Sequence, residues 1–160
     1  MPRTNTLLQT GVPAPDFALT SATGEPYRLS ALQGQKVALF FFRGSWCATC
    51  RMQFAQLRDH LAEYTHLNTQ IIGVTTQRAE AMAEYCQAEG ITFPILIDPA
   101  RLVTKQYDVY NLITWEGINV PHNATFLIDS TGIIRFVHVS VRSTDVPDEP
   151  LLRATLATMT

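Results

Sequence analysis

The sequence has few of the features that mark nucleic-acid-binding, membrane or secreted proteins. Its 12 lysine and arginine residues are outnumbered by 14 aspartate and glutamate residues, and they form no basic run that neutralises phosphates, so we expect no nucleic-acid partner. The longest apolar runs, such as Val37 to Phe42, are far too short to cross a bilayer, so we expect no membrane association. The N-terminus lacks the apolar stretch of a secretory signal, which predicts a cytoplasmic location.

Cysteine is also scarce. The chain has 3 cysteines, an odd number that argues against a disulfide framework, and closely spaced cysteines in a cytosolic protein are more often redox-active or metal-binding than structural. The 160 residues, 46% of them hydrophobic and 16% charged, have an ordinary globular balance. We therefore expect a single domain over residues 1–160, in which residues 1–15 form an extended lead-in.

Short apolar runs alternate with helical patterns along the chain. Unbroken apolar runs predict strands buried on both faces, and apolar residues three and four apart predict helices. Strands are expected at 17–19, 26–29, 36–42, 70–75, 93–97, 125–129 and 133–139. One helix is expected from Ala48 with Met52, Phe54, Leu57, Leu61 and Tyr64 on its buried face, and others at 78–89, 101–107 and 150–159. This order predicts an α/β fold with a mixed central sheet and helices on both faces.

Two cysteines stand where a buried strand gives way to a helix. Cys47 and Cys50 are separated by two residues, a spacing that lets the second sulfur reach the first and close a small disulfide ring. At a helix start, unpaired N–H groups and the helix dipole stabilise a thiolate, whose pKa can fall from about 8.5 to roughly 3.5–7.5. We identify Cys47 and Cys50 as the candidate catalytic residues. Trp46 is a candidate shield or partner platform, and Arg43 is a candidate source of positive charge.

A lone C-x-x-C motif also fits half of a zinc site or a chance pair. A structural zinc site needs four ligands. The sequence has neither a second C-x-x-C motif nor a histidine pair at zinc-finger spacing, since its histidines are scattered at positions 60, 66, 122 and 138. We therefore favour redox chemistry and expect neither a metal nor another cofactor.

Several segments together resemble one known family. The run from Phe41 to Cys50 is similar to the active-site loop of the peroxiredoxin-like branch of the alkyl hydroperoxide reductase and thiol-specific antioxidant (AhpC/TSA) family. Segments 14–17, 93–98 and 125–132 resemble that family's opening and its later strand-and-turn patterns, in order. The resemblance implies a thioredoxin-like fold of the peroxiredoxin type. It also implies an antioxidant thiol oxidoreductase, commonly a homodimer, that reduces hydroperoxides or disulfides.

The resemblance leaves the order of attack open. In peroxidase members of the family, one cysteine attacks the peroxide, becomes a sulfenic acid and is resolved by a second thiol, and the resemblance places that first cysteine at Cys50. The thioredoxin-like pattern of Trp46 followed by C-x-x-C instead makes Cys47 the attacking thiol. In both cases an external dithiol reductant, thioredoxin-like or glutathione-type, reduces the Cys47–Cys50 disulfide. A protein disulfide reductase and a non-catalytic redox-sensing module on the same fold are the alternatives.

Three family positions carry other residues in this chain. The family has proline and threonine before its attacking cysteine where this chain has Arg43 and Cys47, and a peroxide-binding arginine where it has Asn123. Arg43 is a candidate to supply the missing charge. His122, beside Asn123, is a candidate proton donor, the alternative being an ordinary loop histidine.

Cys86 lies late in the second expected helix. Its Cys-x-Ala-Glu-Gly setting resembles that of a resolving cysteine in one peroxiredoxin subfamily, which makes it a candidate to resolve a sulfenic acid at Cys50. The alternative, which we favour, is a buried and inert residue, because Cys47 already stands close enough to Cys50. Trp115 is expected in a loop before the last hairpin, where it either caps the site or packs down.

Overall fold

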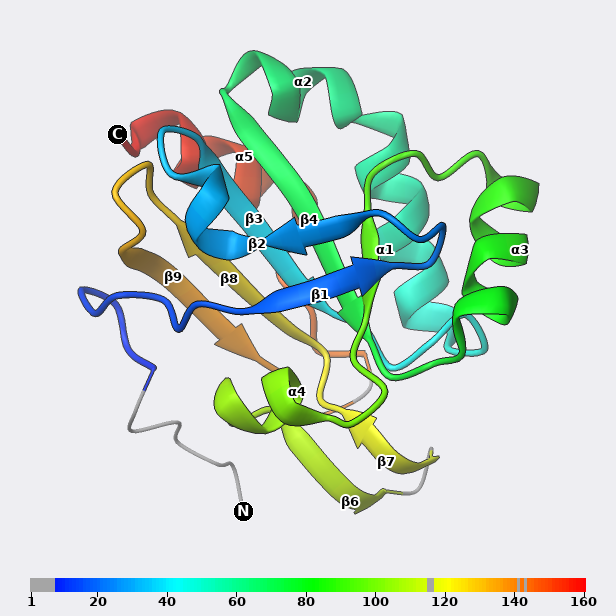
Figure 1. The fold of residues 1–160 in the computed structure, drawn as a ribbon. Helices are drawn as coiled ribbons and strands as arrows, with labels where there is room; N and C mark the ends of the chain where they lie inside the picture. Colours follow the sequence, from blue (N-terminus) through cyan, green and yellow to red (C-terminus); the bar gives the residue numbers. More distant parts are fainter. Residues whose placement is uncertain (1–7, 115–116, 141, 143) are drawn as a thin grey trace.

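The computed structural model describes residues 8–114, 117–140, 142 and 144–160. The strands are β1 (Ala18–Ser21), β2 (Pro26–Arg28), β3 (Lys36–Phe41), β4 (Thr69–Thr75), β5 (Ile95–Ile97), β6 (Tyr110–Thr114), β7 (Gly117–Pro121), β8 (Ala124–Ile128) and β9 (Ile134–Val139). The helices are a short 3-10 helix, η1 (Leu29–Leu32), and α1 (Ala48–Asp59), α2 (Leu61–His66), α3 (Ala79–Glu89), α4 (Leu102–Gln106) and α5 (Glu149–Thr158). A seven-stranded sheet has the order β2-β1-β5-β4-β3-β8-β9, and β6 pairs with β7 (Figure 1).

Strand β3 is an interior strand of the mixed sheet, next to the central strand β4. It pairs in parallel with β4 and antiparallel with β8, and all of its residues are buried. Leu39 and Phe41 belong to the apolar cluster on one face of the sheet, and Ala38 and Phe40 belong to the cluster on the other, because successive side chains of a strand point to opposite faces. The unbroken apolar run therefore supplies two cores at once, as the sequence predicts.

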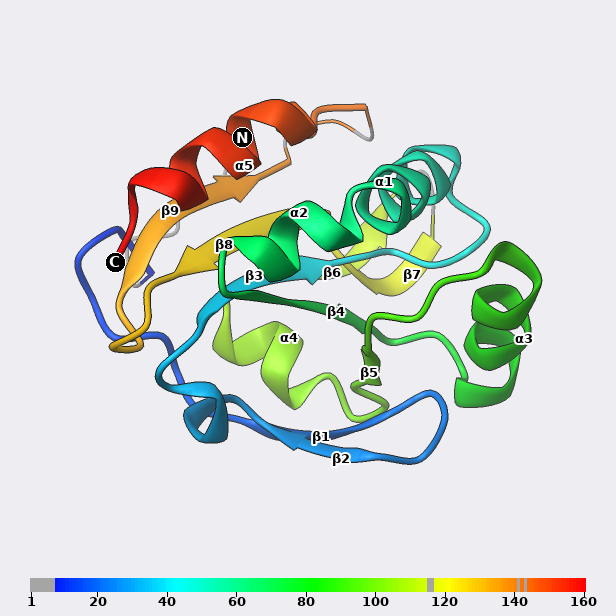
Figure 2. The ribbon, with the colours of Figure 1, turned by 90° about the horizontal axis from the view of Figure 1, so that it is seen from above.

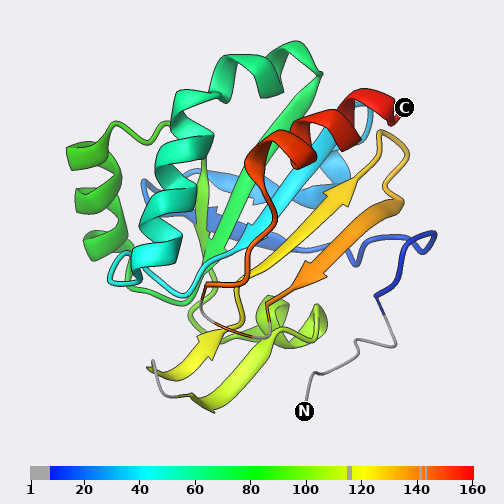
Figure 3. The same ribbon diagram turned by 180° about the vertical axis from the view of Figure 1, so that it is seen from behind.

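Helices cover both faces of this sheet. Helices α1, α2 and α5 lie on one face and α4 lies on the other (Figures 2 and 3). Phe54 of α1 and Leu156 of α5 join the cluster that contains Ala38 and Phe40, and Val103 of α4 joins the cluster that contains Leu39 and Phe41. Among the described residues, no helix has both the length and the apolar character needed to span a membrane.

The structure differs from the predicted elements in three places. The helix expected from Ala48 through Tyr64 is two helices, because His60 has a non-helical backbone with φ −110° and ψ 14° and ends α1. Met52 is 45% exposed rather than core, because it lies two residues from Phe54 and a helix turns through about 200° over two residues. The sequence pattern predicts neither β6 nor β7, which are short and pair with each other outside the main sheet. Trp115, expected in a loop here, lies outside the described residues.

Candidate active site

The end of β3 and the start of α1 place the two cysteines. Cys47 is the N-cap residue of α1, with an extended backbone, and its sulfur accepts a hydrogen bond of 3.3 Å from the Cys50 amide. The first N–H groups of a helix have no intrahelical partner and carry partial positive charge. A thiolate at Cys47 therefore takes the place that a serine or aspartate oxygen takes at an ordinary helix start.

Arg43 approaches the same sulfur from the loop that follows β3. Its Nη2 atom donates a hydrogen bond of 2.8 Å to Cys47 Sγ, and its guanidinium lies 5.9 Å from the ring centre of Trp46. The hydrogen bonds from the Cys50 thiol and amide and the positive charge of Arg43 outweigh burial and lower the pKa of Cys47 to about 5. Cys47 is therefore a thiolate at neutral pH, and its side chain is 5% exposed.

Cys50 has the opposite environment one turn into the helix. It is 0% exposed, and a nitrogen of Asn123 lies 3.7 Å from its sulfur. The hydrogen bond that its thiol makes to Cys47, its burial and the negative charge of Cys47 all raise the pKa of Cys50. The pair therefore consists of one thiolate and one thiol, with the proton held on the buried sulfur.

The loop that carries Arg43 is held by residues from other elements. Gln77, between β4 and α3, accepts a hydrogen bond of 2.7 Å from the Ser45 amide and donates one of 2.8 Å to the Ser45 hydroxyl. Arg51 donates a hydrogen bond of 3.0 Å to the Ser45 carbonyl. These contacts hold the loop at Ser45 and thereby fix the position from which the Arg43 side chain extends.

The sequence and the fold match those of known proteins. The sequence model of the AhpC/TSA family matches residues 10–137. The chain is 31% identical over 157 residues to alkyl hydroperoxide reductase E of Mycobacterium bovis, covering 96% of this chain and 99% of that protein. It is 30% identical over 135 residues to peroxiredoxin Bcp of Escherichia coli (strain K12), covering 81% and 85% of the two chains.

The chain belongs to the AhpC/TSA family. The fold agrees, since the crystal structure of peroxidoxin BcpB from Mycobacterium tuberculosis superposes with a TM-score of 0.82 at 27% identity, covering 93% of this chain and 96% of that one. The fold is thus the thioredoxin-like fold of the peroxiredoxins, as the resemblance implied. The protein is a peroxiredoxin, a thiol peroxidase that reduces hydroperoxides through a cysteine cycle. Of the alternatives that the sequence left open, family membership supports the peroxidase.

The peroxiredoxin site gathers most of the residues singled out in the sequence. Arg43 and Asn123 contact the sulfurs of the cysteine pair, and Trp46, which is 46% exposed, lies beside the Arg43 guanidinium. His122 is half-buried and its amide donates to the Val109 carbonyl at 2.6 Å; its role as a proton donor stays a prediction. Among the described residues, no group of three metal-binding side chains that could hold an ion is found.

Cys86 is half-buried and packs against the apolar cluster that also contains Cys47 and Cys50. It lines a cavity of about 200 Å³ together with Ser21, Tyr27 and Phe93, and burial raises the pKa of its thiol to about 11. At neutral pH it is protonated and a weak nucleophile. Cys86 is half-buried rather than buried as expected, and both its inert and its resolving role stay predictions.

Gln53 and Gln77 belong to the site although the sequence patterns did not single them out. Gln53 is 4% exposed and lies on the buried stripe of α1 with Phe54 and Leu57. A polar residue inside an apolar helical stripe is the signal that could have revealed it. Gln77 reaches Ser45 from a segment more than thirty residues away, and no local pattern indicates such a contact.

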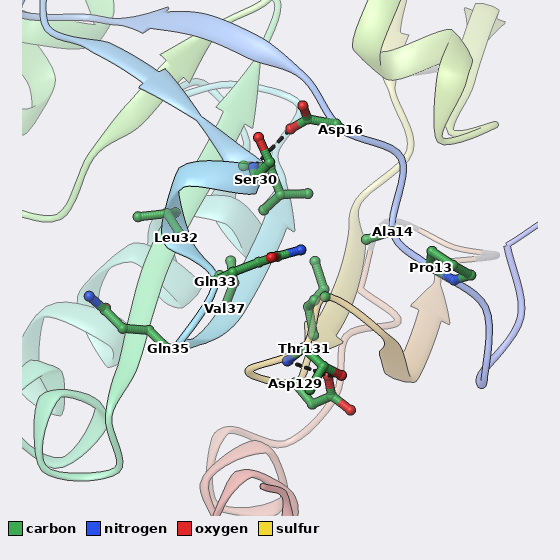
Figure 4. A pocket seen from close by; sticks show the side chains of 13 residues that line it. Pro13, Ala14, Asp16, Ser30, Leu32, Gln33, Gln35, Val37, Asp129 and Thr131 are labelled. Carbon is green, nitrogen blue, oxygen red and sulfur yellow. Dashed lines mark hydrogen bonds between the residues drawn. The ribbon is translucent and has the colours of Figure 1, made fainter.

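A separate pocket lies at the other end of β3. It has a volume of about 120 Å³ and is lined by Asp16, Ser30, Val37, Asp129 and Thr131 among others (Figure 4). Its carboxylates are occupied, because Asp16 accepts from the Ser30 amide at 2.8 Å and Asp129 accepts from the Thr131 amide at 2.9 Å. Val37 is the second residue of β3, and the other end of that strand, at Phe41, lies about 13 Å of extended chain away and leads to the cysteines. This pocket therefore adds no group to the cysteine site.

Proposed function

We propose that Cys47 is the thiolate that attacks the hydroperoxide and that Cys50 is the thiol that resolves it. The observation that carries this assignment is the convergence of the Arg43 guanidinium and the Cys50 amide on the sulfur of Cys47. A thiolate is the nucleophilic form of cysteine, and the same contacts leave Cys50 protonated. The order is the reverse of the one that the family resemblance suggested for Cys50.

The chemistry balances with these two residues. The Cys47 thiolate forms a bond to the terminal oxygen of the hydroperoxide and the O–O bond breaks. The hydroperoxide's own proton passes to the departing alkoxide, which leaves as an alcohol, and Cys47 becomes a sulfenate. The guanidinium of Arg43, next to the reacting sulfur, stabilises the negative charge that spreads over the breaking bond. After the sulfenate takes a proton from water, the Cys50 thiol attacks, releases water and closes the Cys47–Cys50 disulfide.

An external thiol then returns the disulfide to the dithiol. Cys47 is the more exposed sulfur of the pair, so the reductant attacks there and Cys50 leaves. A second thiol of the reductant then resolves the mixed disulfide. In a thioredoxin-like dithiol partner this second thiol belongs to the same molecule, and in a glutathione-type reductant it belongs to a second molecule. A cytoplasmic location, where thiols are kept reduced, suits this cycle. The homodimer implied by the family stays a prediction.

Single-cysteine variants test which sulfur attacks. Reduced Cys50→Ser protein, given one equivalent of hydrogen peroxide and the sulfenic-acid reagent dimedone, is expected to carry the label on Cys47. Cys47→Ser protein is expected to react no faster than a free cysteine. Cys86→Ser serves as the matched control and is expected to behave as the wild type. Rapid labelling of Cys50 in the Cys47→Ser protein would reverse the assignment.

A further inference from the structure

Two buried amides stand behind the resolving thiol. Asn123 directly precedes β8 and is 2% exposed, and Gln53 lies in the second turn of α1 and is 4% exposed. The Nδ2 atom of Asn123 donates a hydrogen bond of 2.7 Å to Gln53 Oε1. The same nitrogen lies 3.7 Å from Cys50 Sγ and donates to it. Asn123 therefore connects α1 to the strand beside it at the level of the cysteines.

The orientation of the Asn123 amide is set by its nitrogen. A side-chain amide has two N–H donors, and these two contacts use both of them. Its oxygen, Oδ1, is buried and has no hydrogen-bond partner among the described residues. An unpaired buried acceptor is unfavourable, so this orientation persists because the nitrogen is needed at Gln53 and at the sulfur.

This orientation decides where the Cys50 proton points. The Cys50 sulfur accepts from Asn123 and has a single hydrogen of its own. With the amide N–H on one side of the sulfur, that hydrogen is left available to Cys47, whose own sulfur accepts from the Cys50 amide at 3.3 Å. The contacts thus form a chain that runs from Asn123 through the Cys50 thiol to the Cys47 thiolate, with Gln53 anchoring its beginning.

We propose that Gln53 and Asn123 are a positioning pair, which directs the Cys50 S–H group toward the Cys47 sulfur. Neither amide touches the peroxide in this assignment, and the pair is uncharged, so the positive charge at the site comes from Arg43. The pair acts on Cys47 only through Cys50. The inference rests on the proposed roles of the two cysteines and adds the residues that align the second one.

The test measures the pH dependence of Cys47 alkylation by iodoacetamide in the reduced protein. Arg43 from the β3–α1 loop and Cys50 from α1 are the titratable groups that act on the Cys47 sulfur. Asn123→Leu, of similar shape but without the donor, is expected to raise the apparent pKa of Cys47 by about one unit, a roughly tenfold loss of thiolate below that pKa. In a Cys50→Ala background the same substitution is expected to leave the apparent pKa unchanged.

A second variant keeps the test decisive if the Asn123→Leu protein does not fold. Gln53→Met removes the anchor while keeping length and apolar contacts, and it is expected to shift the pKa in the same direction by a smaller amount. Gln70→Met is the matched control, because Gln70 is half-buried on β4 and donates to the Ile71 carbonyl; it is expected to leave the pKa unchanged. Circular dichroism of each variant reports whether the fold is kept.

The outcomes separate this inference from the proposed function. An Asn123→Leu shift of equal size with and without Cys50 would overturn the positioning pair, as would unchanged profiles in folded Asn123→Leu and Gln53→Met proteins. Alkylation needs no peroxide, so these results stand whichever cysteine attacks. Failure of the proposed function would appear in the dimedone experiment, as labelling of Cys50.

Discussion

The guanidinium of Arg43 lies 2.8 Å from the sulfur of Cys47. The family pattern that the sequence resembles has a proline at the position of Arg43 and a threonine at the position of Cys47. A charged pair thus replaces two uncharged family residues. The charge-assisted hydrogen bond between them is the strong kind, and it adds to the hydrogen bonds from Cys50 that lower the pKa of Cys47.

Removal of Arg43 is expected to weaken the thiolate. In Arg43→Ala protein the apparent pKa of Cys47 should rise from about 5 by roughly one to two units, the usual effect of losing an opposite charge at contact distance. The rate of reaction with hydrogen peroxide at pH 6 should fall about two- to tenfold, because the thiolate fraction falls by that factor. Alkylation and stopped-flow measurements across pH check both numbers. Arg28→Ala is the control, because it removes an exposed arginine that pairs with Asp16; it should change neither the pKa of Cys47 nor the peroxide rate. Equal effects from both variants would show that Arg43 does not act through its contact with Cys47.

The stability of the reduced protein should depend on pH with a maximum near pH 8.5. The pKa of Cys47 is lowered to about 5 in the folded state, so between about pH 5 and pH 8.5 the unfolded chain holds a proton that the native protein has released. The free energy of unfolding therefore rises with pH in this range. The raised pKa of Cys50 has the opposite sign, and its stabilisation is lost as pH increases above about 8.5.

Urea denaturation of the reduced and oxidised protein at several pH values measures this dependence. The difference between the two forms isolates Cys47 and Cys50, because Cys86 titrates in both. In reduced Cys47→Ser protein the rise between pH 5 and 8.5 should disappear. A reduced-minus-oxidised difference that is flat across this range in the wild type would show that Cys47 has an ordinary pKa.

Gly44 should tolerate no side chain. Its φ is +154°, and a Cβ atom there would lie 2.4 Å from Trp46 Nε1 and 2.9 Å from Gln77 Oε1. Gly44→Ala is expected to displace both side chains, to cost about 1–3 kcal/mol and to slow the peroxide reaction. Gly24→Ala is the matched control, since Gly24 has φ +97° and an open surrounding. The Gly24→Ala variant should have backbone strain like that of Gly44→Ala, but it should change neither the peroxide rate nor the tryptophan fluorescence.

Loss of Cys86 should leave the cycle intact. Burial raises the pKa of this thiol to about 11, so it is a slow nucleophile at neutral pH. Reduced Cys86→Ala protein is expected to consume peroxide at the wild-type rate and to form the same Cys47–Cys50 bridge, as read by peptide mapping. A bridge between Cys50 and Cys86 in the wild type, absent in the variant, would make Cys86 the resolving cysteine.

Local sequence was sufficient to predict the centre of the fold and the place of the cysteines. The unbroken apolar run predicts that β3 is buried on both faces, and the residues after it have a helical apolar period. The strand, the turn and the position of Cys47 at a helix start can therefore all be predicted from residues close together in the sequence. The break at His60 did not follow, because the apolar period continues from α1 into α2 while the backbone at that residue departs from the helix.

The electrostatics of the site depend on contacts between distant segments. Family resemblance favoured Cys50 as the attacking cysteine, yet the charge at the site depends on which sulfur Arg43 reaches. The direction of that side chain depends on its loop, which Gln77 holds from beyond β4. Asn123 likewise reaches Cys50 across seventy-three positions of sequence. Such contacts arise from sheet order, and local patterns do not indicate them.

The most direct test of the assignment is stopped-flow oxidation of the reduced wild-type protein by hydrogen peroxide from pH 4 to pH 8, followed by mass-spectrometric mapping. The predicted result is a rate constant that rises with an apparent pKa near 5, as it does for Cys47, with the loss of two thiols into a Cys47–Cys50 disulfide. A rate constant that keeps rising through pH 8, or that matches a free thiol throughout, would contradict Cys47 as the attacking thiolate.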